Sequence, residues 1–415
     1  MNRFCLVCSA VLALFSAAIS QEKEITADLD PLITLPAAYN LTPDQIPEMY
    51  PKGNWNKNPH FEWLTEDKSR AIFKRHLGGG LEVDLTILDG TVPVQEAVLD
   101  FKDGKFLGVT FSIHNRGDGR SIESAEFSRR FKEVGRHLGT QLAARPQFRK
   151  GNERIGILSE GYIWMSARGM AVLEYDLGTK ADGSGKKEFL RMRLAKREAK
   201  GMYAAAMQTR PQAVKAGGLV RNVKKTPSGD IYVDNVPMVD QGAKGYCVVA
   251  SAQRLFEYYG IPCDMHQLAV LTKADPDQGT SPLLTNEQLG GIDHLFKTRF
   301  TCIAIGHNNS LVELVDNKYV GDRVEYRDFH KAVTKSVDEG IPLLWSLHLG
   351  IAPEEPAISP QASGGHMRMI IGYNDKEEKY IFSDSWGAGH EFKKMTYSDT
   401  FKVTKGLFLM RPTTR

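Results

Sequence analysis

Four residues in the C-terminal half of the sequence could together carry out nucleophilic catalysis: Cys247, His366, Asp384 and Gln241. A cysteine attacks as its thiolate, so a base must take the thiol proton and a third group must hold the imidazole in the right tautomer. The oxyanion of the tetrahedral intermediate also needs hydrogen-bond donors, such as a side-chain amide and the nucleophile's own backbone amide. The four residue types therefore predict a thiol nucleophile, its base, an orienting carboxylate and an oxyanion donor, in that order.

Cys247 lies at the start of a predicted helix. The stretch 241–260 reads QGAKGYCVVASAQRLFEYYG, and apolar residues recur in it at helical spacing until Gly260 and Pro262 end the pattern. Free backbone amides and the positive end of the helix dipole favour a thiolate in a first turn. A lone cysteine is more often a small core residue, so a reactive role depends on a base elsewhere in the chain.

A predicted hairpin supplies that base. His366 follows two glycines and begins an apolar strand, and the next strand ends in the segment 382–387, FSDSWG. Since a hairpin brings the end of its second strand near the start of its first, we expect Asp384 beside His366. Two other histidines could compete as the base: His348 and His390. We favour His366 because His348 lies inside an apolar strand and has no acidic partner downstream in a hairpin.

These motifs resemble those of papain-like cysteine peptidases. QGAKGYCVVAS is similar to the family's active-site segment, with the same interval of six from glutamine to cysteine, and GGHMRMIIGYN and DSWG resemble its later motifs. Lys244 and Val248 depart from the papain pattern, and Asp384 stands where papain-like enzymes usually have asparagine. A closer resemblance, over about residues 235–411, is to the bacteriocin-processing peptidases, which share four features with this sequence: Val236-Pro237, Tyr258-Tyr259-Gly260-Ile261, Gly279-Thr280-Ser281 and Asp384.

The resemblance implies a papain-like α+β fold for residues 231–415, in which the helix with the nucleophile packs on an antiparallel sheet. It implies hydrolysis of peptide bonds in a peptide or protein substrate, with no cofactor or metal. Two alternatives stay open. The same residues could serve a thiol amidase or an acyl or transpeptidase enzyme acting on cell-wall or modified peptides, or the fold could belong to a non-catalytic binding protein.

A separate α+β domain is predicted at residues 63–195. One helix is expected over 121–142, and turns are expected at Asp89-Gly90 and Asp103-Gly104. Strand patterns occur at 81–88, 109–113, 161–177 and 189–194. We interpret the polar cluster 114–118 (HNRGD) as a solvated hairpin turn rather than a binding loop. The domain could be a pro-region, a substrate-recruiting module or an independent binding domain.

The remaining segments predict export and two connections. Arg3 precedes an apolar run over 4–19, and small residues suit cleavage near Ser20-Gln21, so residues 1–20 are predicted to be a signal peptide. The protein would then be secreted or periplasmic, without a membrane span after signal removal. We expect an extended lead-in at 21–62 and a basic linker at 196–230.

Composition and cysteine count limit the function classes further. A net charge of +3 over 415 residues, without a dense basic stripe, argues against nucleic-acid binding. Signal removal leaves three cysteines, and an odd number suggests one free thiol. Cys263 and Cys302 could form a disulfide or remain two unpaired thiols, and the oligomeric state is open.

Overall fold

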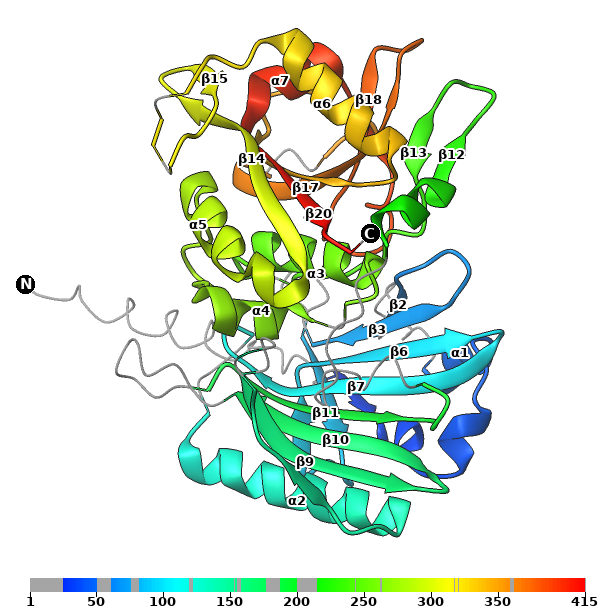
Figure 1. Cartoon of the computed structure of the whole chain (residues 1–415). Helices are drawn as coiled ribbons and strands as arrows, with labels where there is room; N and C mark the ends of the chain where they lie inside the picture. Colours follow the sequence, from blue (N-terminus) through cyan, green and yellow to red (C-terminus); the bar gives the residue numbers. More distant parts are fainter. Residues whose placement is uncertain are drawn as a thin grey trace, which may run out of the picture.

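The computed structural model describes residues 25–50, 61–75, 82–118, 122–152, 154, 158–176, 187–199, 215–242, 244–261, 263–316, 318–319, 321–358 and 362–414. Two parts are stacked on one another, and each has its own sheet (Figure 1). The fold is α+β, as predicted. The predicted signal peptide at 1–20 lies outside the described residues.

The N-terminal part is an antiparallel sheet covered by one long helix. The strand order is β2 (Phe61–Trp63), β3 (Arg70–Lys74), β6 (Glu96–Lys102), β7 (Lys105–Asn115), β11 (Phe189–Ala195), β10 (Gly169–Asp176), β9 (Ser159–Ser166) and β8 (Gln147–Arg149). The helix α2 (Ser124–Leu142) buries Val134, Leu138 and Leu142, which share one face at helical spacing. A smaller sheet contains β1 (Ile25–Asp28), β4 (Val83–Ile87) and β5 (Val92–Val94).

The predicted extended lead-in at 21–62 is wrong over residues 25–50. Strand β1 pairs with β4, and a short helix α1 (Gln45–Met49) follows two 3₁₀ turns, Asp30–Leu32 and Ala37–Asn40. Leu29, Leu32 and Ile46 are fully buried in the N-terminal core. Their irregular spacing gives no helix or strand period, so the sequence pattern did not reveal that they pack.

The strand predicted at 161–177 is two strands, β9 and β10, that pair with each other in a hairpin. The turn between Ser166 and Gly169 contains Ala167 and Arg168 and lacks the Asp-Gly signal of the other two turns, which is why the sequence pattern did not divide the strands there. The turns predicted at Asp89-Gly90 and Asp103-Gly104 are confirmed, and all four residues have positive φ, as type I′ turns require.

The C-terminal part is an antiparallel sheet with helices around it. The main strand order is β12 (Val223–Lys225), β13 (Ile231–Val233), β17 (Gly364–Asn374), β16 (Leu343–Leu349), β20 (Thr404–Pro412), β14 (Thr298–His307) and β15 (Ser310–Val312), with β18 (Lys379–Ser383) on β17 and β19 (Lys393–Thr396) on β18. The helices are α3 (Cys247–Tyr258), α4 (Met265–Thr272), α5 (Pro282–Ile292), α6 (Tyr326–Asp338) and α7 (Tyr397–Val403).

The linker predicted at 196–230 is wrong in its second half. Residues 216–222 form a 3₁₀ helix, and β12 pairs with β13, which itself pairs with β17. Leu219 is buried in the C-terminal core and anchors this otherwise polar segment there. Strand β14 and helix α6 were not predicted at all.

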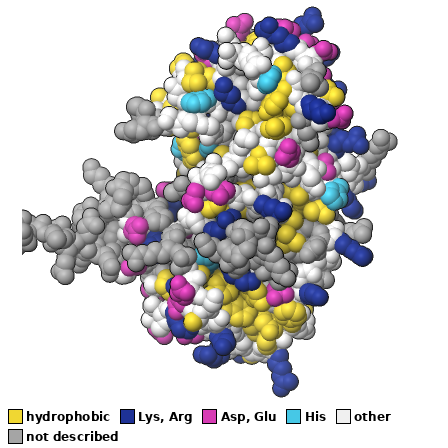
Figure 2. All heavy atoms as spheres, turned by 90° about the vertical axis from the view of Figure 1, so that its left-hand side faces the viewer, with side chains coloured by type: hydrophobic (Ala, Val, Ile, Leu, Met, Phe, Trp, Pro, Cys, Tyr) yellow, Lys and Arg dark blue, Asp and Glu magenta, His cyan; other side chains and the backbone are white. Residues whose placement is uncertain are grey.

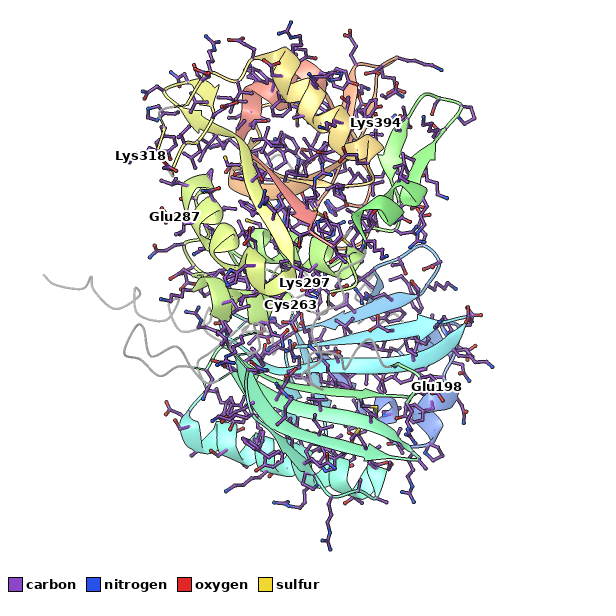
Figure 3. All side chains as sticks on the ribbon, viewed as in Figure 1. Glu198, Cys263, Glu287, Lys297, Lys318 and Lys394 are labelled. Carbon is purple, nitrogen blue, oxygen red and sulfur yellow. The ribbon has the colours of Figure 1, made fainter. Side chains whose placement is uncertain are left out.

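The two parts meet where α3 and α4 face the N-terminal sheet (Figure 1). Each part has its own hydrophobic core, and a smaller cluster of Leu64, Ile72 and Met238 joins them. A cavity of about 400 Å³ lies at this boundary, with Cys263 in its wall, and Figure 3 shows this cysteine in the middle of the molecule.

No helix among the described residues is long and apolar enough to cross a membrane. On the face drawn in Figure 2, basic and acidic side chains are interspersed among the coloured residues. The absence of nucleic-acid binding stays a prediction.

Candidate active site

Cys247 is the first residue of α3, as the sequence pattern predicted. No side chain caps this end of the helix, so its first backbone amides are available to other groups. Eleven of the twelve residues of α3 are buried, and Cys247 is one of them, with 9% of its surface exposed. The thiol therefore lies at the amide-rich end of a helix that the core holds rigidly.

The β17–β18 hairpin brings His366 and Asp384 together. His366 is the third residue of β17, and Asp384 follows the last residue of β18. The Nε2 atom of His366 lies 2.6 Å from Oδ1 of Asp384. His366 also interacts with the Cys247 side chain, and Nδ1 is the ring nitrogen that does not face Asp384.

The ionisation of His366 is governed by Asp384. Burial disfavours the charged imidazolium, but the charge and hydrogen bond of Asp384, with the contact to Cys247, outweigh burial and raise the pKa of His366 to about 9. Burial also favours the neutral form of Asp384, which by itself would raise the pKa of this carboxyl. The charge and hydrogen bond of His366 and the charge of Arg368 nevertheless hold the pKa of Asp384 at about 2. At neutral pH this geometry favours a protonated His366 beside an ionised Asp384.

We predict that the histidine resonances of His366 titrate with a midpoint near pH 9, measured by NMR on isotope-labelled protein. The folded-state pKa lies above the ordinary value of 6.5. Protonation of His366 therefore stabilises the fold fully below pH 6.5, and this contribution is lost as the pH rises through about 9. In Asp384→Asn the midpoint should fall, because burial lowers the pKa of His366 and the opposing negative charge of Asp384 is gone. A midpoint near 6.5 in both proteins would contradict this electrostatic account.

Asp384 is itself held by a buried charge network. Its Oδ2 atom accepts a hydrogen bond of 2.7 Å from Nε of Arg368, and its Oδ1 atom accepts one of 2.8 Å from the Ser385 amide. Arg368 also binds Glu354 at 2.6 Å, and Lys393 lies 2.5 Å from Glu354. Each buried charge in the network thus has an opposite partner.

Gln241 lies alongside the segment that carries Asp384. Its backbone amide donates to the Ser385 carbonyl at 2.9 Å, and its side-chain oxygen accepts from the Ser385 hydroxyl at 2.8 Å. The other end of the amide faces the Lys244 carbonyl, which can only accept, and this contact fixes which end is nitrogen. Nε2 donates one hydrogen to the Lys244 carbonyl at 3.1 Å, which leaves one hydrogen for another acceptor.

Comparison with known proteins finds a family match for the C-terminal part of the chain. Residues 233–407 match the Peptidase_C39 like family. This segment is therefore similar to that family, and we call it the C39-like region. It contains the four residues Cys247, His366, Asp384 and Gln241, and the N-terminal part of the chain lies outside it. No curated protein matches the chain.

Among solved structures, the chain is similar to xylellain, a cysteine protease from Xylella fastidiosa, at 12% identity and a TM-score of 0.24. That similarity covers 47% of this chain and 88% of xylellain. A TM-score this low supports no argument about the present chain.

Within the C39-like region, Trp386 shields one face of the imidazole. Its ring stacks on His366 with the centroids 4.5 Å apart and the planes 29° apart. The alternative bases have other surroundings: His348 contacts the backbone carbonyl of Leu349, and His390 packs edge-on against Trp386. Of these three histidines, the structure places His366 against the carboxylate.

Two buried arginines of the C39-like region were missed by the sequence analysis. Arg368 lies two residues after His366, on the same face of β17. Arg254 of α3 is 1% exposed and donates to Pro237 O, Asp384 O and Ser383 Oγ, which ties the nucleophile's helix to the end of β18. An arginine inside an apolar strand or helix was the available signal, because such a charge needs buried acceptors.

All three cysteines of the described chain are free, so Cys263 and Cys302 form no disulfide. Burial raises the pKa of Cys263 well above its ordinary value and raises that of Cys302 to about 12. Both thiols therefore stay protonated and unreactive at neutral pH. Among the described residues, no group of three or more His, Cys, Asp or Glu side chains could hold a metal ion.

Proposed function

We propose that the chain is a cysteine peptidase that hydrolyses peptide bonds with Cys247 as nucleophile. The observation that carries this proposal is the chain of contacts Cys247–His366–Asp384 at the N-terminal end of α3. A purely packing role for Cys247 would not account for an adjacent histidine that is oriented by a buried carboxylate. Membership of residues 233–407 in the C39-like family supports the same reaction class.

In the proposed reaction, the Cys247 thiolate attacks the carbonyl carbon of a peptide bond. The resulting oxyanion accepts hydrogen bonds from the free Nε2 hydrogen of Gln241 and from the Cys247 amide. His366 gives its proton to the leaving amine, which departs and leaves a thioester on Cys247. His366 then takes a proton from water, the hydroxide displaces the thiolate, and the product leaves with a new carboxylate.

Asp384 and Trp386 support His366 in these steps. Asp384 accepts the Nε2 hydrogen of His366, so that Nδ1 faces the thiol and carries the transferred proton. Trp386 covers one face of the imidazole and limits the access of water. The N-terminal apolar run supports export as part of the proposal, although it lies outside the described residues.

The proposal is tested by incubating the full chain with a mixture of peptides and identifying the products by mass spectrometry. We expect fragments that carry one added water, and none after prior alkylation of Cys247. An added amine distinguishes transfer from hydrolysis: amide products in place of carboxylates would replace the peptidase proposal with the transferase alternative. A folded protein that yields neither product would contradict both.

A further inference from the structure

Side chains of the N-terminal part hold the segment that carries Gln241. We call the described residues 240–242 and 244–246 the oxyanion loop. This loop contains Gln241 and leads directly into Cys247. Three residues of the loop bind side chains from the N-terminal part. Asp240 precedes Gln241, and Lys244 and Tyr246 follow it.

The first contact is at Asp240, which directly precedes Gln241. Lys74, at the end of β3, lies 2.7 Å from Oδ2 of Asp240 and 3.1 Å from Glu62. The other Asp240 oxygen accepts from the Gly242 amide at 2.8 Å. Asp240 also forms a β-bridge with Trp386, the residue that stacks on His366. Lys74 therefore neutralises a carboxylate that organises both sides of the site.

The second contact is at Lys244, whose carbonyl accepts one hydrogen of Gln241 Nε2. The Lys244 ammonium is nearly inaccessible, with 1% of its side chain exposed, and lies 2.6 Å from Asp118. Asn115 also donates to this Asp118 oxygen at 2.9 Å. A buried ammonium without its partner would be strongly unfavourable, so Asp118 determines where Lys244 and its carbonyl lie.

The third contact is at Tyr246, the residue before Cys247. Its hydroxyl donates to Glu188, which also accepts from Arg116 at 2.6 Å. Arg116 in turn donates to the Ala274 carbonyl at 2.8 Å. The cluster 114–118, which we interpreted from sequence as a solvated hairpin turn, is thus a contact between the two parts. That interpretation was wrong because the partners of Arg116 and Asp118 are distant in sequence.

We propose that the N-terminal part positions the oxyanion loop, with Lys74 and Asp118 as positioning residues for Gln241. The inference rests on the proposed peptidase function. It assigns the N-terminal part a role opposite to that of an inhibitory pro-region, because its charges complete the loop. Neither Lys74 nor Asp118 touches the reacting atoms in this account, since both act through Asp240, Lys244 and Gln241.

The test compares Lys74→Met and Asp118→Asn in the full chain with Arg70→Met. Arg70 pairs with Glu257 at 2.9 Å across the same boundary, but at the C-terminal end of α3 and away from the oxyanion loop. We expect the first two variants to lower kcat by about tenfold or more, with KM little changed, because a misplaced oxyanion donor costs transition-state binding. Lys74→Arg should restore most of the loss, and Arg70→Met should stay within about twofold of wild type.

Alkylation of Cys247 by iodoacetamide provides the second readout. This displacement occurs at a saturated carbon, forms no oxyanion and needs only the thiolate. Its rate should therefore stay within about twofold of wild type in all these variants. Equal losses of kcat in Lys74→Met and Arg70→Met, or an alkylation rate that falls in parallel with kcat, would overturn the inference in favour of a general structural role.

Hydrogen exchange separates this inference from the proposed function. Amides of the oxyanion loop should exchange faster in Lys74→Met and Asp118→Asn than in wild type or Arg70→Met, whether or not the protein cleaves peptides. Unchanged exchange would overturn the positioning role. If these amides exchange faster in the two variants but the wild-type protein hydrolyses no peptide, the positioning role stands and the peptidase function is contradicted.

Discussion

Replacement of Cys247 by alanine, or of His366 by alanine, is expected to lower kcat for peptide hydrolysis by at least about 10³-fold. The structure joins the two residues in one contact chain, so neither can form the thiolate and imidazolium pair alone. The double variant should then be no slower than the worse single variant, because residues that act as a unit lose their effect together. Steady-state kinetics on purified, folded variants measure this.

The matched control for His366 is His348→Ala. His348 lies on the neighbouring strand β16, is half-buried and pairs in register with Gly365 beside His366. It contacts a backbone carbonyl instead of a carboxylate. Its removal should leave kcat within a few-fold of wild type. A loss in His348→Ala as large as that in His366→Ala would show that the base has been assigned to the wrong histidine.

The second large effect is expected at Asp384, where alanine should reduce both stability and activity. Removal of the carboxylate leaves the fully buried Arg368 with Glu354 as its remaining carboxylate partner, and the loss of one member of a buried pair costs about 3–5 kcal/mol. Urea unfolding of Asp384→Ala should show a loss of this size. The kcat of the folded fraction should fall by roughly 10³-fold or more, since His366 loses its orienting group.

Asp384→Asn separates the two effects. Asp384 accepts from His366 on one oxygen and from Arg368 on the other, whereas an asparagine has only one accepting oxygen. Arg368 can act only as a donor, so the amide must leave one of the two partners facing an NH₂ group. We expect a smaller stability loss than in alanine, about 1–3 kcal/mol, with kcat still strongly reduced. Wild-type kcat in Asp384→Asn would contradict the need for two accepting oxygens.

The sequence predicted the position of Cys247 and the contact between His366 and Asp384 where a local pattern determines geometry. The apolar residues at helical spacing before Gly260 placed Cys247 in the first turn of a helix. The predicted hairpin was enough to predict the contact of His366 with Asp384. Both inferences depend on residues close together in the chain or on one antiparallel turn. The role of each residue in catalysis remains a prediction.

The sequence could not predict contacts between distant segments. Nothing near Asp118 reveals that it binds Lys244, 126 residues later, and nothing near Lys74 points to Asp240. The packing of residues 25–50 onto the N-terminal sheet was missed for the same reason. Such contacts follow from how two sheets and their helices meet, which local periodicity does not encode.

The most direct test of the account is labelling by a peptide with a thiol-reactive chloromethyl ketone, followed by peptide mapping at neutral pH. The three cysteines retained after the predicted signal cleavage make the test internally controlled, because burial keeps Cys263 and Cys302 protonated. The account predicts rapid labelling of Cys247 alone, with a rate at least about 100-fold lower in His366→Ala. Folded wild-type protein that stays unlabelled at Cys247, or that reacts equally fast without His366, would contradict the central claim.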